Sequence, residues 1–240
     1  MRAIGIRRLR EYTDPASFEL LTSLFFDEDD ETRDAVLDHL ASLDTPEADA
    51  AIAWEAVYNE KAEHRAASLE TLVELSDLRP TPTLVTDVFR SGLRERSDEP
   101  AEAAAHAAAS LRLFELIPLM ASAQVAGGRA GDPQGDLAWI FVGTQQTFVA
   151  DVQPIVSDNT VAFDPQLAVV SEGSILRVSG AYVAIYRVAI NRSLIGMTSE
   201  AWGQSTASMG YDTDAWHAWY EDEFKPFLAA KAAIEPPAQP

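Results

Sequence analysis

DETRDAVLDHLASL (30–43) and AEHRAASLETLVEL (62–75) are two versions of one pattern, placed 32 residues apart. In each, a glutamate and an arginine precede leucines that recur every three residues. Leucines at this spacing share one face of a helix. The aligned leucines are Leu37, Leu40 and Leu43 in the first stretch and Leu69, Leu72 and Leu75 in the second. A helix repeated with the same apolar face predicts a repeat architecture.

A proline begins the helix that precedes each repeated stretch. Pro15 and Pro46 are 31 residues apart, and Pro82 follows after a further 36. Proline suits the first turn of a helix, where its missing N–H has no intrahelical partner to lose. Residues able to cap these helices stand just before the prolines: Asp14, Thr45 and Thr81. Each unit is therefore expected to be a helix A, a short acidic turn and a helix B.

The third helix B is expected at 99–117, with Ala104, Ala108 and Leu111 on its inner face. Residues 2–15 align with 33–46, so the chain begins inside a repeat, at a helix B. Solenoids end in capping repeats. Either this half-repeat is the cap, or the chain is a piece of a longer solenoid.

The proline starts, the E-x-R opening of helix B, the leucine spacing and the period of 31–36 resemble the HEAT family of armadillo-like α-solenoids. The resemblance covers residues 1–120. It implies that Arg33 and Arg65 bond acidic residues of a neighbouring repeat. Isolated repeats cannot bury their apolar faces, so neighbours must stack.

A change of pattern marks the second half. Residues 121–136 are rich in glycine and predict a linker or loop. Residues 137–197 predict an antiparallel β-meander of four or five strands that packs on the last helices. The expected strands are LAWIFVG (137–143), TFVADVQPIV (147–156), SILRVSG (174–180) and YVAIYRVAINRSLIG (182–196). The expected turns are FDPQ (163–166), SEG (171–173) and SGA (179–181).

An aromatic helix is expected within 198–232. It runs from Asp214 to about Ala230, capped by Asp212 or Thr213, and precedes a tail at 233–240. Its aromatic face comprises Trp216, Trp219, Tyr220, Phe224 and Phe227. We expect this face to hold the β-unit on the solenoid, although aromatic platforms for a sugar or peptide are the alternative. The fold class is thus α+β: a HEAT-type solenoid, a small β-meander and a C-terminal aromatic helix.

GTQQ (143–146) and GYDTDAWHAW (210–219), together with the repeats, are similar to stretches of uncharacterised HEAT-repeat proteins from GC-rich bacteria. Many of those proteins are exported. The resemblance implies no activity. The compartment stays open: cytoplasmic if Met1 is the true start, exported if the chain is a fragment.

The composition restricts the partners. The formal net charge is −20, from 38 acidic and 18 basic residues. Such a surface disfavours nucleic acid and anionic lipid and suits a basic partner protein, a cation or a salty environment. The alternative is that the excess charge only keeps the chain in solution. The chain contains no cysteine, which excludes disulfides and thiolate chemistry. No apolar run is long enough to span a membrane.

A search for catalytic motifs finds little. The histidines are expected at surfaces or in turns, and none is spaced as a zinc ligand: His39, His64, His106 and His217. DEDDE (27–31) lacks the glycine and distal glutamate of a calcium loop. Asp212 and Asp214 lack the companion motif of an aspartic protease. We therefore assign no catalytic, cofactor-binding or metal-binding residue.

Three functions remain in view. We expect a non-catalytic scaffold with an acidic concave surface that binds a protein or peptide of basic character. The first alternative is an enzyme or accessory subunit with a site built from Glu63, His64, Asp98 and His106. The second is a structural spacer within a larger protein. The oligomeric state is not predicted.

Overall fold

Helices dominate the computed structural model, which describes residues 8–26, 29–129, 138–157, 160–178 and 182–234. The chain divides into two compact units. One unit comprises the chain up to Ala126 and from Ile185 onward, and the other comprises Gly127–Ala184. Residues 2–7 of the predicted half-repeat at 2–15, and residues 235–240 of the tail at 233–240, lie outside the described residues.

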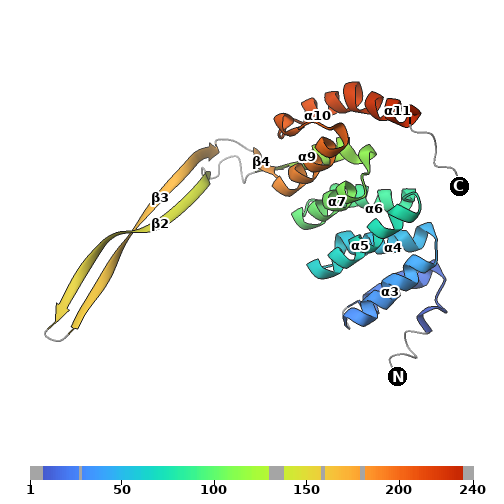
Figure 1. Cartoon of the computed structure of the whole chain (residues 1–240), viewed down its shortest axis with the longest axis horizontal. Helices are drawn as coiled ribbons and strands as arrows, with labels where there is room; N and C mark the ends of the chain where they lie inside the picture. Colours follow the sequence, from blue (N-terminus) through green and yellow to red (C-terminus); the bar gives the residue numbers. More distant parts are fainter. Residues whose placement is uncertain (1–7, 27–28, 130–137, 158–159, 179–181, 235–240) are drawn as a thin grey trace. The chain divides into compact units, whose positions relative to one another are not determined.

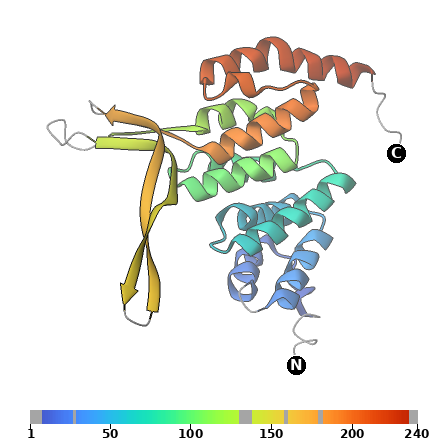
Figure 2. The same ribbon diagram turned by 60° about the vertical axis from the view of Figure 1, so that its left-hand side comes forward.

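Three helical hairpins occupy the first half, as the repeat pattern predicts. They are α2 (Phe18–Phe25) with α3 (Asp30–Ser42), α4 (Pro46–Tyr58) with α5 (Ala62–Leu78), and α6 (Thr83–Leu93) with α7 (Asp98–Ser110). Each helix packs on its own partner and on a helix of the next pair, as α4 does on α5 and α6. Figure 2 shows these helices following one another in the order of the sequence, from blue to green. The packing is compatible with a helical-repeat solenoid.

The helix starts follow the predicted chemistry at two of three positions. Asp14 Oδ1 accepts from the Ala16 N–H at 3.0 Å and caps the short 3₁₀ turn η1 (Pro15–Ser17) that leads into α2. Thr45 Oγ1 caps α4 in the same way. The prediction for Thr81 is wrong, because Pro82 itself is the N-cap of α6 and no side chain caps that helix.

The repeated leucines lie in the core. Leu37, Leu40 and Leu72 are buried, and the other aligned leucines pack against them half-buried. On α7 the predicted inner face is confirmed, since Ala104, Ala108 and Leu111 are buried. Small side chains on this face allow the neighbouring helices to approach closely.

The predicted helix over 99–117 is wrong in its length, because α7 ends at Ser110. Arg112 adopts a left-handed conformation with φ of 53°. The Leu113 N–H donates to Ala108 O at 2.9 Å, and the Arg112 N–H donates to Ala109 O at 3.1 Å. This is the Schellman pattern that ends a helix. The chain then turns through η2 (Phe114–Leu116) into α8 (Ile117–Ala123).

A fourth pair of helices is interrupted in sequence. α8 and α9 (Val188–Trp202) pack together, and α9 also packs on α7. The predicted strand at 182–196 is therefore wrong beyond Tyr186. Ile190, Leu194 and Met197 are buried at spacings of four and three, which is a helical period. The 64 residues between Ala123 and Val188 thus separate the two members of one helical pair.

In the described part of this region, two two-stranded sheets replace the predicted four- or five-stranded meander. β2 (Ala138–Ser157) pairs antiparallel with β3 (Thr160–Val178), in a register that runs from Ala138 opposite Val178 to Ser157 opposite Thr160. One irregularity falls between Val149 and Asp151. β1 (Val125–Arg129) pairs with β4 (Tyr182–Tyr186). Figure 1 shows β2 and β3 as one long ribbon.

Two expected turns and a loop also need correction. FDPQ and SEG lie inside β3, where Pro165 is opposite Val152 and Gly173 is opposite Gly143. Both strands of a two-stranded ribbon are edges, and edges tolerate proline. The expected loop at 121–136 includes the end of α8 and strand β1, and its residues 130–136 lie outside the described part, as does the turn at 179–181.

The aromatic C-terminal helix is confirmed. α10 (Thr213–Trp219) begins with Asp212 as N-cap, whose Oδ1 accepts from the Ala215 N–H at 3.0 Å. A π-helical turn, η4 (Tyr220–Phe224), joins it to α11 (Lys225–Ile234). Trp216 and Phe224 are fully buried. These rings pack within the helical unit and are part of its core.

Candidate functional site

A groove of about 920 Å³ lies between the second helices of two successive pairs, α5 and α7. We call it the α5–α7 groove. Its apolar lining is made of short side chains from both helices: Ala62, Ala66, Leu69, Val73 and Ala103. The rim is dominated by carboxylates: Glu70, Glu74, Asp98, Glu99 and Glu102.

Arg65 is the one lysine or arginine in this lining, and its guanidinium is already engaged. Its Nη2 pairs with Glu99 Oε1 at 2.8 Å, and its Nη1 donates to Asn59 O at 2.6 Å. Arg65 therefore neutralises one carboxylate of the groove and ties α5 to α7. This is the inter-repeat bond expected for it. Arg33, by contrast, pairs with Asp30 and Asp34 of its own helix.

Asp98 is engaged from outside the groove. Arg187 Nε donates to Asp98 Oδ1 at 2.7 Å. Within the described residues, the side chains of Glu70, Glu74 and Glu102 have no hydrogen bond or ion pair. Glu70 and Glu74 are four residues apart, so they lie on the same face of α5. The groove thus presents three carboxylates that are available to a ligand.

Arg187 holds the elements around Asp98 together. This buried residue stands just before α9, and its Nη2 donates to Glu95 O at 3.2 Å and to Arg96 O at 2.8 Å. Its backbone N–H donates to Gln124 O at 2.9 Å. It thereby joins the start of α9 and the end of α8 to the α6–α7 turn. No periodicity in the sequence distinguished Arg187, because it lies in a run expected to be a strand.

A second polar junction lies beside it. Gln124 is fully buried, and its Oε1 accepts from Asn191 Nδ2 at 2.8 Å. The same nitrogen donates to Gly210 O at 2.8 Å. Gln124, Arg187 and Asn191 together explain how the fourth helical pair remains joined although 64 residues separate its members.

Two of the four residues proposed for an enzymatic site line the α5–α7 groove. Asp98 and His106 line the α5–α7 groove, whereas Glu63 and His64 do not. His64 is buried, and its ring meets the Phe26 ring edge-on with centroids 5.8 Å apart. A single shared ligand in the groove would contact only two of the four.

Two other histidines bond to backbone oxygens. His39 is buried and its Nε2 lies 2.9 Å from Tyr12 O. His217 Nε2 lies 3.0 Å from Pro118 O. The expected surface or turn position is therefore wrong for His39 and for His64, which the helix packing encloses.

The remaining motifs have local roles in the described residues. In the DEDDE stretch, Asp29 Oδ1 accepts from the Thr32 N–H at 3.0 Å and caps α3, while residues 27 and 28 lie outside the described part. The structure places no group of three or more potential metal ligands together in the residues it describes. Among those residues, no helix is both long and apolar enough to cross a bilayer.

No protein-family model, curated protein or solved structure matches this chain.

Proposed function

We propose that the chain is a HEAT-type scaffold that binds a basic segment of a partner protein in the α5–α7 groove. The observation that carries the proposal is the group of three unpaired carboxylates, Glu70, Glu74 and Glu102, above an apolar lining. The period of the helical pairs and the bonding of Arg65 to the next pair support the HEAT assignment.

Lysine and arginine suit this groove because each combines an apolar stem with a charged head. The stems would cover Leu69 and Val73, and the heads would pair with the carboxylates. Exposed ion pairs contribute about 0.2–1 kcal/mol each, so three pairs change affinity by roughly tenfold. The net charge of −20 would also attract a basic partner over a distance.

Fluorescence anisotropy of a labelled Lys/Arg-rich decapeptide tests the proposal. The unmodified chain should bind it in 50 mM salt and bind at least several-fold more weakly in 300 mM salt, because salt screens exposed charges. The variant Glu70→Gln/Glu74→Gln/Glu102→Gln should weaken binding about tenfold. Because these side chains have no partner in the described residues, the folded state should be unaffected.

A matched control distinguishes binding in the groove from attraction by the overall negative charge of the chain. The variant Glu115→Gln/Asp222→Asn/Glu223→Gln removes the same number of charges from exposed positions that do not line the groove. It should keep most of the affinity. Equal losses in the two variants would mean that binding follows net charge alone, and no loss in the groove variant would refute the proposal.

A further inference from the structure

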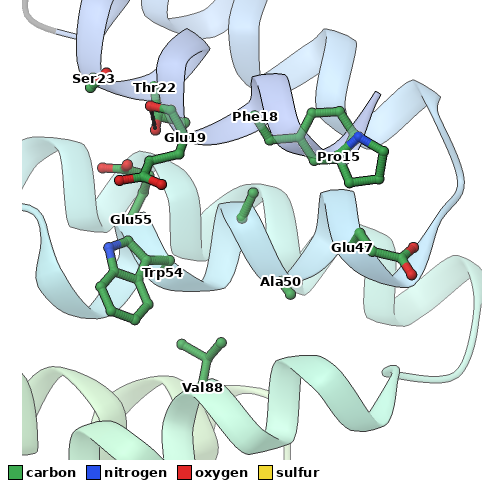
Figure 3. Close-up of a pocket in the computed structure, with 11 residues that line it drawn as sticks. Pro15, Phe18, Glu19, Thr22, Ser23, Glu47, Ala50, Trp54, Glu55 and Val88 are labelled. Atoms are coloured by element: carbon green, nitrogen blue, oxygen red, sulfur yellow. Dashed lines mark hydrogen bonds between the residues drawn. The ribbon is translucent and has the colours of Figure 1, made fainter. Parts of the chain in front are cut away.

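A second cavity, of about 620 Å³, lies among the first helices of the three pairs, α2, α4 and α6. We call it the Trp54 pocket. Figure 3 shows Trp54, Glu19 and Glu55 toward one end, and Pro15 and Glu47 toward the other. Its helices are not those that line the α5–α7 groove, apart from the α4 residue Ala56 at the edge of the groove.

Trp54 offers an open aromatic face. Trp54 is 53% exposed, although its side chain is the largest apolar group of the pocket. The indole stacks on Tyr58, with ring centroids 4.1 Å apart and an interplanar angle of 29°. The stack holds one face of the indole and leaves the other accessible. Tryptophan is the best of the aromatic rings at attracting a cation to its face.

The charge of the pocket has one sign. Glu19, Glu47 and Glu55 line it, and no lysine, arginine or histidine does. Glu55 is only 9% exposed, yet the one hydrogen bond to its carboxylate within the described residues is from a neutral amide, Asn59 Nδ2, to Oε2 at 2.8 Å. Buried carboxylates are normally paired with a cation.

The position of Glu55 near the C-terminal end of α4 makes a cation beside its carboxylate still more favourable. Glu55 lies in the last turn of α4, where the helix dipole is negative and no basic residue is present. The negative charge of the carboxylate and the negative end of the helix dipole therefore lie at the same place. A positive group against Trp54 would relieve both, and its apolar substituents could lie against Phe18, Ala50 and Val88.

We propose that the Trp54 pocket binds a methylated ammonium group. The carboxylates of the pocket do not gather into a group of three that could hold a metal ion in the described residues. Simple ammonium is strongly hydrated, and the apolar side chains of the wall would not replace its water. A methylated ammonium is weakly hydrated, presents methyl groups to the wall and carries the charge that the indole face and Glu55 attract. The group could be part of a small molecule or of a methylated lysine side chain.

Isothermal titration calorimetry with choline tests this inference against 3,3-dimethylbutan-1-ol, an uncharged molecule of the same shape. Choline should bind, and the neutral isostere should bind at least about fivefold more weakly, because it lacks the cation–π attraction. Equal binding of the two, or no binding of choline, would overturn the inference. A trimethyl-lysine peptide then distinguishes the sources: tighter binding than choline favours a side chain, and weaker binding favours a small molecule.

Variants locate the site. Trp54→Leu should weaken choline binding about fivefold or more, and Glu19→Gln should weaken it in the same direction. Tyr12→Leu and Glu11→Gln remove an exposed ring and an exposed charge that do not line the pocket, and should leave binding unchanged. Unchanged binding in Trp54→Leu would refute the assignment. Because Trp54 is half exposed, an unchanged melting temperature should show that this variant folds.

Discussion

Replacing Arg187 by alanine should lower the free energy of unfolding by about 4 kcal/mol. The guanidinium is 5% exposed and donates to Asp98 Oδ1 and to three carbonyl oxygens, those of Glu95, Arg96 and Ala123. A hydrogen bond that involves a charged group contributes about 1.5–3 kcal/mol, so the two shorter carbonyl bonds, to Glu95 and Arg96, account for roughly 3 kcal/mol at the low end. The Asp98 side chain is 59% exposed, so its ion pair adds about 1 kcal/mol at most.

The loss should come from geometry as well as charge. Arg187→Lys keeps the positive charge but replaces a planar fork of donors by one compact ammonium. Arg187→Lys should recover only about half of the stability that Arg187→Ala loses. A single ammonium group cannot reach all the carbonyl and carboxylate oxygens to which the planar guanidinium donates. Arg90→Ala is the control, since the pair between Arg90 and Asp87 is formed within one helix at the surface. It should cost no more than about 1 kcal/mol.

Urea unfolding followed by far-ultraviolet circular dichroism at pH 7 measures these differences. The slope of free energy against urea should be the same in all variants, so that the midpoints report stability. A chain of this size loses about 2–4 °C in melting temperature per kcal/mol, so Arg187→Ala should melt roughly 8–16 °C lower. A loss equal to that of Arg90→Ala would show that Arg187 does not hold the fourth pair in place.

Two further outcomes are expected. Gly92→Ala should destabilise the chain by about 1–2 kcal/mol, although alanine has the better helix propensity. The new Cβ would lie 2.7 Å from Ala104 Cβ and 2.8 Å from Val57 Cγ1, which is too close. A variant that is more stable than the unmodified chain in urea unfolding would contradict this prediction. The pKa of Tyr58 is raised above 10.0, mainly by burial and to a smaller extent by the nearby carboxylate of Glu95. The unfolded state therefore releases this proton first as the pH rises, and stability should fall above about pH 10. Between pH 9 and 11.5 the Tyr58→Phe variant should lose less stability than the unmodified chain. An identical loss in the two chains would contradict the raised pKa of Tyr58.

The predictions that were confirmed rest on local chemistry. The leucine period, the prolines at the helix starts and the caps at Asp14, Thr45 and Asp212 each act within a few residues of chain. Such features can be recognised without knowing the rest of the fold. Where a local rule failed, as at Thr81, the proline itself took the capping position.

The missed elements depend on contacts with distant parts of the chain. The run 182–196 contains β-branched residues and was expected to be one strand, but only its first part pairs, with β1. Its second part becomes α9 because Ile190 and Leu194 can be buried against α7. The expected turns FDPQ and SEG likewise lie inside β3, because a ribbon with two edges tolerates Pro165.

Part of the candidate site can be predicted from the sequence. The sequence predicted an acidic surface on a stack of helices, and the unpaired carboxylates of the α5–α7 groove, Glu70, Glu74 and Glu102, lie within the predicted second and third helices B. It could not show which carboxylates are already paired. Asp98 is engaged by Arg187, which is 89 residues away, and only the folded chain distinguishes it from Glu102.

By itself, the sequence determined the helical pairs, their buried faces, the aromatic C-terminal helix and the excess of negative charge. Only the packing of distant segments makes α8 and α9 partners, joins them to the α6–α7 turn through Arg187, and places Trp54 and Glu55 in one pocket with Glu19 of α2. The physical reason is the range of the interactions. Helix propensity, caps and periodicity act along a few residues, whereas grooves and ion pairs between helices exist only once distant segments are packed together.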